Sequence, residues 1–237
     1  MTLILTQGSE RYVLQVSDRL LTQPRRRKPF DPVSNKTTIY LTTDALISIA
    51  YSRAAYLDQT PTDQWIAEIL KGERHALNAQ GALELGRHRQ WPDIDQTTEL
   101  IRAALESSVR SLESPPLVHI VVAGWKWDTA EAHPIVVHIL NSEADPSIVD
   151  VRPLQLPKPV KAETGSPLML SAAPTDNPLS PDEFKQLFEE LRRTNPWPGD
   201  SLRVLVEAIR LAASKATEGG QPGLHVCLPT SSIGRRS

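Results

Sequence analysis

The sequence has a single cysteine, no long apolar run and no excess of basic residues, and each absence excludes a class of protein. With Cys227 alone, a monomer can form neither an internal disulfide nor a zinc site built on several cysteines. No run of 18 apolar residues occurs, and the first residues lack the basic and apolar segments of a signal peptide. We therefore expect no membrane association and a cytoplasmic location. The net charge of -2 argues against a general nucleic-acid binder, for which a strongly basic domain is expected.

What the sequence contains is typical of a globular protein. Hydrophobic residues make up 40% of the 237 residues and charged residues 23%, so the size of the core is not limiting. We expect one domain over residues 1–237, with residues 230–237 as a disordered tail. His119, His138 and His225 lie in β-rich runs without a carboxylate or cysteine at ligand spacing. Core or surface roles are therefore expected for them, and no metal or cofactor.

The first quarter of the chain has the pattern of β-hairpins. Four β-rich runs pair into two hairpins, residues 3–6 with 12–17 and residues 37–41 with 45–51. Gly8-Ser9-Glu10 and Thr42-Thr43-Asp44 supply the turns, and we expect the two hairpins to form one four-stranded sheet element. Between them lies a basic run from Arg25 to Lys28, which we interpret as the end of a solvated loop. A phosphate site or a site for an acidic partner is the alternative for this run.

The rest of the chain alternates between helical and β patterns. Residues 54–57 begin the first helical stretch, and Thr62 caps an amphipathic helix after Pro61. Further apolar periodicity predicts helices at 95–113, 180–193 and 200–215, and strands at 117–123, 134–140, 148–156, 167–171 and 224–228. We expect the strands at 148–156 and 167–171 to continue the sheet that 117–123 and 134–140 begin.

This order of elements predicts an α+β fold. Hairpins, two helices, more hairpins, two helices and a final strand can bury their apolar faces as two sheets between helix layers. A doubly wound parallel sheet fits poorly, because hairpins require antiparallel neighbours. No repeat of fixed period is visible.

Three reactive side chains lie in strand-like sequence within the first 36 residues. Thr2 follows Met1, Asp18 ends the run from Tyr12, and Lys36 opens the run to Leu41. Once Met1 is removed, a threonine at the N-terminus carries its own base, because its α-amine lies close to its hydroxyl. A fixed ammonium nearby would favour the neutral amine. A buried lysine needs a partner, and Asp18 is placed to supply one for Lys36.

With these residues, the sequence resembles the N-terminal-nucleophile (Ntn) hydrolases, nearest to the proteasome β-subunits and their bacterial relatives. Thr2, Asp18, Thr22 and Lys36 fall on the family pattern. Residues 121–125, with Asp128 just after, look like the central strand of the family and its turn. Glu218-Gly219-Gly220 looks like the turn before its closing strand. The resemblance implies the four-layer αββα sandwich of the family, with two antiparallel sheets between helix layers.

The resemblance also implies a peptidase or amidohydrolase mechanism. Thr2 Oγ would attack the carbonyl to give an acyl ester, and Asp18 and Lys36 would tune the nucleophile. Thr22 would align the substrate backbone, and backbone N–H groups around Ser52 and Arg53, after a strand ending at Tyr51, would hold the oxyanion. Ser171 would replace the serine of the family's Gly-Ser-Gly segment. A peptide or amide substrate, a homo-oligomer and an unfoldase partner follow from the same relatives.

Three departures from the family pattern support an alternative function. Arg53 stands where the family usually has glycine, and Ala172 and Ala173 replace glycines near Ser171. Lys215 occupies the position of an aspartate that supports the amine in the family. The alternative is a catalytically inactive scaffold or partner-binding module on the same fold.

Overall fold

The computed structural model describes most of the chain in eleven segments, residues 3–18, 21–22, 29–31, 36–71, 92–128, 131–142, 144–154, 168–173, 179–194, 197–216 and 224–227. Predictions that fall on Thr2, the basic run from Arg25 to Lys28, the turn from Glu218 to Gly220 and the tail at 230–237 lie outside these residues. For Asp18, Thr22 and His225 the backbone is described but the side chain is not.

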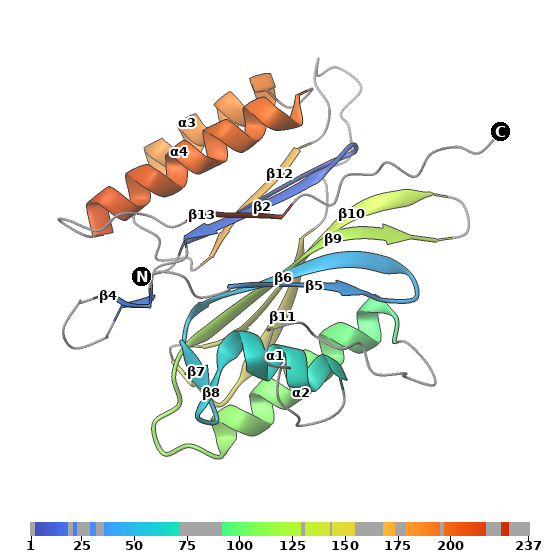
Figure 1. The fold of residues 1–237 in the computed structure, drawn as a ribbon, viewed down its shortest axis with the longest axis vertical. Coiled ribbons are helices and arrows are strands. Elements are labelled where there is room, and N and C mark those ends of the chain that lie inside the picture. Colours follow the sequence, from blue (N-terminus) through green and yellow to red (C-terminus); the bar gives the residue numbers. More distant parts are fainter. Residues whose placement is uncertain are drawn as a thin grey trace.

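Two antiparallel sheets stack face to face between two layers of helices (Figure 1). One sheet has four strands in the order β12-β1-β2-β13, built from β1 (Ile4–Ser9), β2 (Val13–Asp18), β12 (Leu168–Ala173) and β13 (Leu224–Cys227). The other has five strands in the order β11-β10-β9-β6-β5, built from β5 (Thr37–Leu41), β6 (Ala45–Arg53), β9 (Val118–Trp127), β10 (Ala132–Asn141) and β11 (Val149–Leu154). The predicted α+β class and its four-layer sandwich are confirmed.

Both predicted N-terminal hairpins form, but they belong to different sheets. β1 pairs with β2 and also with β12, whereas β5 pairs with β6 and β6 pairs with β9. The expected four-stranded element is therefore wrong, as is the expectation that the strand at 167–171 continues the sheet of 117–123 and 134–140, since β12 joins β1. The reason is that the sequence pattern of a hairpin predicts only the pairing of its own two strands. The lateral neighbour of each hairpin is chosen by long-range packing.

The hairpin turns also differ in detail from the prediction. Gly8 lies inside β1 rather than in the turn, which closes where Ser9 N–H donates to the Tyr12 carbonyl at 3.0 Å. Gly124 lies inside β9, and the strand continues to Trp127, so the turn begins only at Asp128. A side chain at Gly124 is excluded because its Cβ would lie 2.1 Å from the Leu46 carbonyl oxygen of β6.

Four helices cover the outer faces of the sheets in the described part of the chain, α1 (Thr62–Lys71), α2 (Ile94–Arg110), α3 (Pro181–Thr194) and α4 (Pro198–Ala216). In the same described part, no helix is long and apolar enough to cross a membrane. Residues 54–57 do not begin a helix: β7 (Tyr56–Leu57) pairs with β8 (Thr60–Pro61). Asp58 and Gln59 form the turn of this ribbon with φ of 49° and 64°, which no helix can contain. A second ribbon pairs β3 (Leu21–Thr22) with β4 (Pro29–Asp31).

Three apolar clusters fill the spaces between the four layers. One joins the five-stranded sheet to α1 and α2 through residues such as Ile49, Ile101 and Ile120. A second joins the four-stranded sheet to α3 and α4. The third lies between the two sheets and includes Ile4 of β1 and Ala50 of β6. Alternate residues of β1, β6 and β9 thus belong to two different clusters, so these strands are apolar on both faces.

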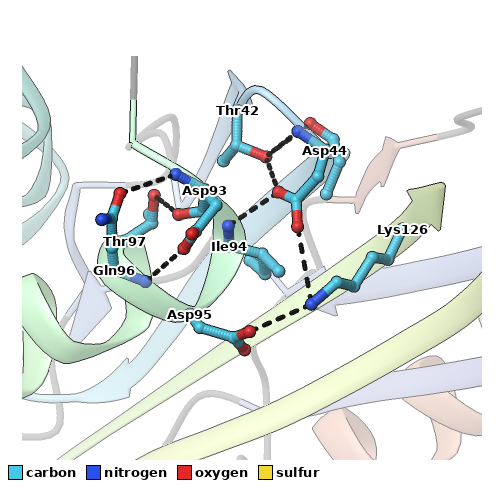
Figure 2. A network of polar contacts seen from close by, with 9 residues as sticks. Thr42, Asp44, Asp93, Ile94, Asp95, Gln96, Thr97 and Lys126 are labelled. Carbon is cyan, nitrogen blue, oxygen red and sulfur yellow. Dashed lines mark hydrogen bonds and ion pairs between the residues drawn. The ribbon is translucent and has the colours of Figure 1, made fainter. Parts of the chain in front are cut away.

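A polar network fixes α2 to one end of the five-stranded sheet (Figure 2). Asp44, in the turn between β5 and β6, accepts hydrogen bonds through Oδ1 from Thr42 Oγ1 at 2.9 Å and from the Ile94 N–H at 2.8 Å. Its Oδ2 lies 3.5 Å from Lys126 Nζ of β9. Asp93 caps the same helix in a capping box with Gln96. The start of α2, the turn and the end of β9 are therefore held together.

Candidate functional site

The opposite end of the five-stranded sheet carries Lys36, which directly precedes β5. Its side chain is 0% exposed, and it is among the largest completely buried side chains. The Lys36 carbonyl accepts the Tyr51 N–H at 3.3 Å, which places the residue beside the last part of β6. We call this place the Lys36 end and define it by Lys36, Ser52 and Arg53. An ammonium taken wholly out of water is costly without compensation, so its burial marks a special site.

Ser52 and Arg53 are the last two residues of β6, and the strand does not end at Tyr51 as the sequence predicts. Ser52 is 1% exposed, and its Oγ has no hydrogen-bond partner among the described residues. Arg53 has a φ of 75°, a left-handed conformation that favours glycine. The resemblance expects glycine here, and the backbone adopts the glycine-type conformation although the residue is arginine. Such strain in a residue with a Cβ is typical of functional sites.

The backbone register brings the start of β1 and the end of β2 together. Ile4 lies opposite Ser17, so Leu3 and Asp18, the next residues outward along the two strands, lie at the same end of this strand pair. Asp18 is the last residue of β2, opposite Leu224 of β13. Thr22 lies in the separate ribbon of β3 and β4, opposite Pro29. Since Thr2 is outside the described residues, the catalytic roles of Thr2, Asp18 and Thr22 stay predictions.

Ser171 and Lys215, which the comparison with the family pattern also singles out, lie on β12 and α4. Ser171 of β12 is opposite Thr6, four positions after Thr2 in the sequence. It is 7% exposed, and its Oγ has no partner among the described residues. Lys215, in the last turn of α4, forms an ion pair with Glu183 of α3. This contact, together with hydrogen bonds from Ser180, lowers the pKa of Glu183 to about 2.

Two buried histidines form a pair that the sequence pattern alone did not join. His119 Nε2 of β9 lies 2.7 Å from His138 Nδ1 of β10. Burial, and secondarily the positive charge of Arg152, lowers the pKa of His138 to about 4. In the hairpin of β9 and β10, His119 lies opposite Leu140 and His138 lies opposite Val121, so the two histidines are diagonal neighbours on one face. The register of the hairpin predicted between 117–123 and 134–140 was therefore the signal that joins them. Within the described ranges, no group of three or more histidine, cysteine or carboxylate side chains could hold a metal ion.

Comparisons with known proteins identify the fold. No family model and no curated protein matches the sequence. Among solved structures, the chain is similar to Anbu (ancestral β-subunit) from Yersinia bercovieri, with a TM-score of 0.55 and 9% identity over 96% of this chain and 81% of that one. It is also similar to an Anbu mutant from Hyphomicrobium sp. strain MC1, with a TM-score of 0.57 and 10% identity over 97% of this chain and 82% of that one. A third similar structure is Anbu in a helical assembly from Pseudomonas aeruginosa, with a TM-score of 0.51 and 11% identity over 96% of this chain and 81% of that one. The chain therefore has the proteasome β-subunit-like fold of the Ntn hydrolases.

Proposed function

We propose that the protein is an N-terminal threonine peptidase or amidohydrolase that acts after removal of Met1. The observation that carries the proposal is the complete burial of Lys36 at the head of β5, on a fold of the proteasome β type. A lysine in that position is part of the pattern in which Thr2, Asp18 and Thr22 also fall. An inert scaffold has no evident need for a wholly buried ammonium, since an apolar side chain of similar size is often at least as stable.

In the proposed mechanism, the α-amine of Thr2 takes the proton from its own Oγ as this oxygen attacks the substrate carbonyl. An acyl ester forms and the amine of the substrate leaves with the proton. Water then attacks the ester, and the carboxylic acid product leaves Thr2 free. The ammonium of Lys36, paired with Asp18, keeps the α-amine neutral and stabilises the developing negative charge on Oγ.

Backbone N–H groups at the end of β6 are proposed to stabilise the oxyanion. Such a donor contributes about 3 to 4 kcal/mol when it is fixed in advance. The left-handed φ of Arg53 supports this role, because it gives the backbone at Ser52 and Arg53 a direction that a regular strand does not have. Thr22 is proposed to align the substrate backbone. The role of Ser171 as the serine of the family's Gly-Ser-Gly segment stays a prediction, and no step of this mechanism uses it.

Homo-oligomerisation belongs to the proposal as well. The Anbu of Pseudomonas aeruginosa forms a helical assembly, as its structure is described. We propose that this chain also assembles from copies of itself, and that an unfoldase or another protein partner presents the peptide or amide substrate.

Peptide cleavage in a complex mixture tests this function even though the natural substrate is not identified. The full-length protein would be incubated with a peptide digest, and new peptide termini would be counted by mass spectrometry. Thr2→Ala should abolish cleavage and Thr2→Ser should retain it, because serine preserves the hydroxyl beside the amine. Cleavage unchanged in Thr2→Ala would contradict the proposal. No cleavage by the wild type would favour the partner-binding module that Arg53 and the Lys215–Glu183 pair suggest.

A further inference from the structure

A cavity of about 340 Å³ is lined by β12 of the four-stranded sheet and by β9, β10 and β11 of the five-stranded sheet. β12 is the outer strand of the four-stranded sheet on this side, and β11 is the outer strand of the five-stranded sheet. Phe184 of α3 lines the cavity together with Leu140, Leu154, Leu170 and Ala172. Pockets for small molecules occupy about 300 to 1,000 Å³ and are mostly apolar with a few polar groups. The volume and the apolar lining fit a small ligand.

Two polar atoms of the lining have no hydrogen-bond partner among the described residues. They are Ser171 Oγ and His138 Nε2, in side chains that are 7% and 8% exposed. A buried polar atom without a partner costs about 1 to 3 kcal/mol. The other ring nitrogen of His138 is held by His119 at 2.7 Å, so the orientation of the ring is fixed. When His138 Nδ1 accepts from His119, the Nε2 of the neutral ring carries the proton and can donate it to a ligand.

The charged group of the lining is the guanidinium of Arg152. Its side chain is 60% exposed and contacts Asp150 Oδ2 at 2.9 Å, and the Asp150 side chain is 45% exposed. An exposed ion pair of this kind contributes little, so another carboxylate can compete for the guanidinium. Arginine binds a carboxylate through two parallel hydrogen bonds, which are stronger than hydrogen bonds between neutral groups. The cavity thus combines an anion-binding group, two polar atoms that need partners, and an apolar wall.

We propose that this cavity binds a small monocarboxylate with an apolar body. Arg152 holds the carboxylate, and Ser171 Oγ and His138 Nε2 donate hydrogen bonds to it. The apolar body lies against Leu154, Leu170 and Phe184. The site does not use Thr2, so it stands independently of the proposed hydrolysis.

Binding of hexanoate to the full-length protein tests the proposal, followed by calorimetry and by the NMR signals of the histidine rings. Hexanamide has the same shape without the charge, and acetate has the charge without the apolar body. Hexanoate should bind at least about tenfold more tightly than either, because only hexanoate uses both parts of the site. The ring signals of His138 should shift on binding, and the pKa of His138 should rise because a carboxylate beside the ring favours its protonated form. Absence of saturable hexanoate binding, or equal binding of hexanoate and hexanamide, would overturn the proposal.

Two variants separate the site from non-specific binding. Arg152→Gln should weaken hexanoate binding by about tenfold or more, and Ser171→Ala by a smaller factor. Arg203→Gln is the matched control, since Arg203 on α4 is 73% exposed and lies 3.6 Å from Asp200 in a similar surface pair. It should leave hexanoate binding unchanged, as should Thr2→Ala. Equal weakening by Arg152→Gln and Arg203→Gln would overturn the assignment of the carboxylate to Arg152.

Discussion

Each end of the five-stranded sheet carries a lysine, and the two lysines have opposite surroundings. Lys126 is 26% exposed and lies 3.0 Å from Asp95 and 3.5 Å from Asp44 (Figure 2). Its hydrogen bond with Asp95 raises the pKa of Lys126. Lys36 is 0% exposed at the head of β5. The first lysine joins a surface network that ties α2 to the sheet, whereas the second is wholly removed from solvent.

The two ends also differ in how many unusual features they contain. At the Lys126 end, each carboxylate of the network accepts a hydrogen bond or forms an ion pair, and α2 begins with an ordinary N-cap. At the Lys36 end, a buried ammonium, an Oγ of Ser52 that has no hydrogen-bond partner within the described segments, and the left-handed Arg53 occur together. Such costs persist in proteins chiefly where they serve function. We therefore assign a structural role to the Lys126 end, and the Lys36 end is where we propose that catalysis takes place.

We expect the largest effect from exchanging each lysine for an apolar residue of similar length. Lys36→Met should slow the reaction of Thr2 with an epoxyketone by roughly 100- to 10,000-fold, the usual range for loss of a positioned proton-transfer or charge partner. Lys126→Met should leave the rate unchanged and cost at most about 1 kcal/mol of folding stability. Rates would be followed by intact mass. Equal slowing in both variants would contradict the assignment of catalysis to the Lys36 end.

The histidine pair lies beside the Lys36 end, because His119 is opposite Ser52, and it should make folding stability depend on pH. The pKa of His138 is lowered to about 4 from 6.5, so the unfolded chain takes up a proton at a higher pH than the folded protein does. Folding stability should therefore fall as the pH falls from 6.5 to 4, by about 3 kcal/mol in total. Denaturant titrations at pH 7 and pH 4 measure the fall, and His138→Gln should remove this part of it. The same pH dependence in His138→Gln would show that other groups cause it.

Substitution of Asp44 tests the structural role of the Lys126 end. Asp44→Ala should destabilise the protein by about 2 kcal/mol, because the Ile94 N–H at the start of α2 loses its acceptor and Thr42 Oγ1 keeps only the Ala45 carbonyl, at 3.1 Å. The epoxyketone rate should not change. Asp95→Ala is the matched control, since Asp95 is 84% exposed and shares Lys126. It should cost less than about 0.5 kcal/mol in the same thermal or denaturant melt. Similar losses in the two variants would mean that the backbone contact to α2 is unimportant.

Arg53→Gly should have the smallest effect on stability. Glycine removes the strain of the left-handed conformation but increases the conformational entropy of the unfolded chain, so we expect a net gain in folding stability of about 0.5 kcal/mol. Gln59→Gly, with a φ of 64° in the turn between β7 and β8, should gain a similar amount. Only Arg53→Gly should raise the epoxyketone rate, because it removes a long side chain beside the proposed oxyanion site. A slower reaction in Arg53→Gly would show that the arginine side chain assists the chemistry.

Local patterns predicted the elements well, and long-range pairing less well. Capping residues and apolar periodicity located α2, and alternating β-rich runs located both N-terminal hairpins. The pattern missed the ribbon at 56–61, because the positive φ values of Asp58 and Gln59 have no glycine to signal them. It also joined the two hairpins in one sheet, because two-faced apolar strands do not reveal their lateral neighbours.

The candidate site was only partly predictable. Lys36 was found through its place in a pattern, but its complete burial follows from the stacking of the sheets and had no local signal. The pairing of His119 with His138 was encoded in the register of a predicted hairpin. The cavity beside them was not, because the sequence predicted the strand at 167–171 in the same sheet as the strands before it, whereas β12 lies in the other sheet and faces them across the cavity.

The most direct test of the central claim is the intact mass of the purified protein before and after incubation with an epoxyketone. This electrophile requires both an N-terminal hydroxyl and its α-amine. Our account predicts a starting mass without Met1, a single stable adduct on the N-terminal peptide, and no adduct in Thr2→Ala. Retained Met1, or a free Thr2 that forms no adduct, would contradict the assignment of Thr2 as the nucleophile.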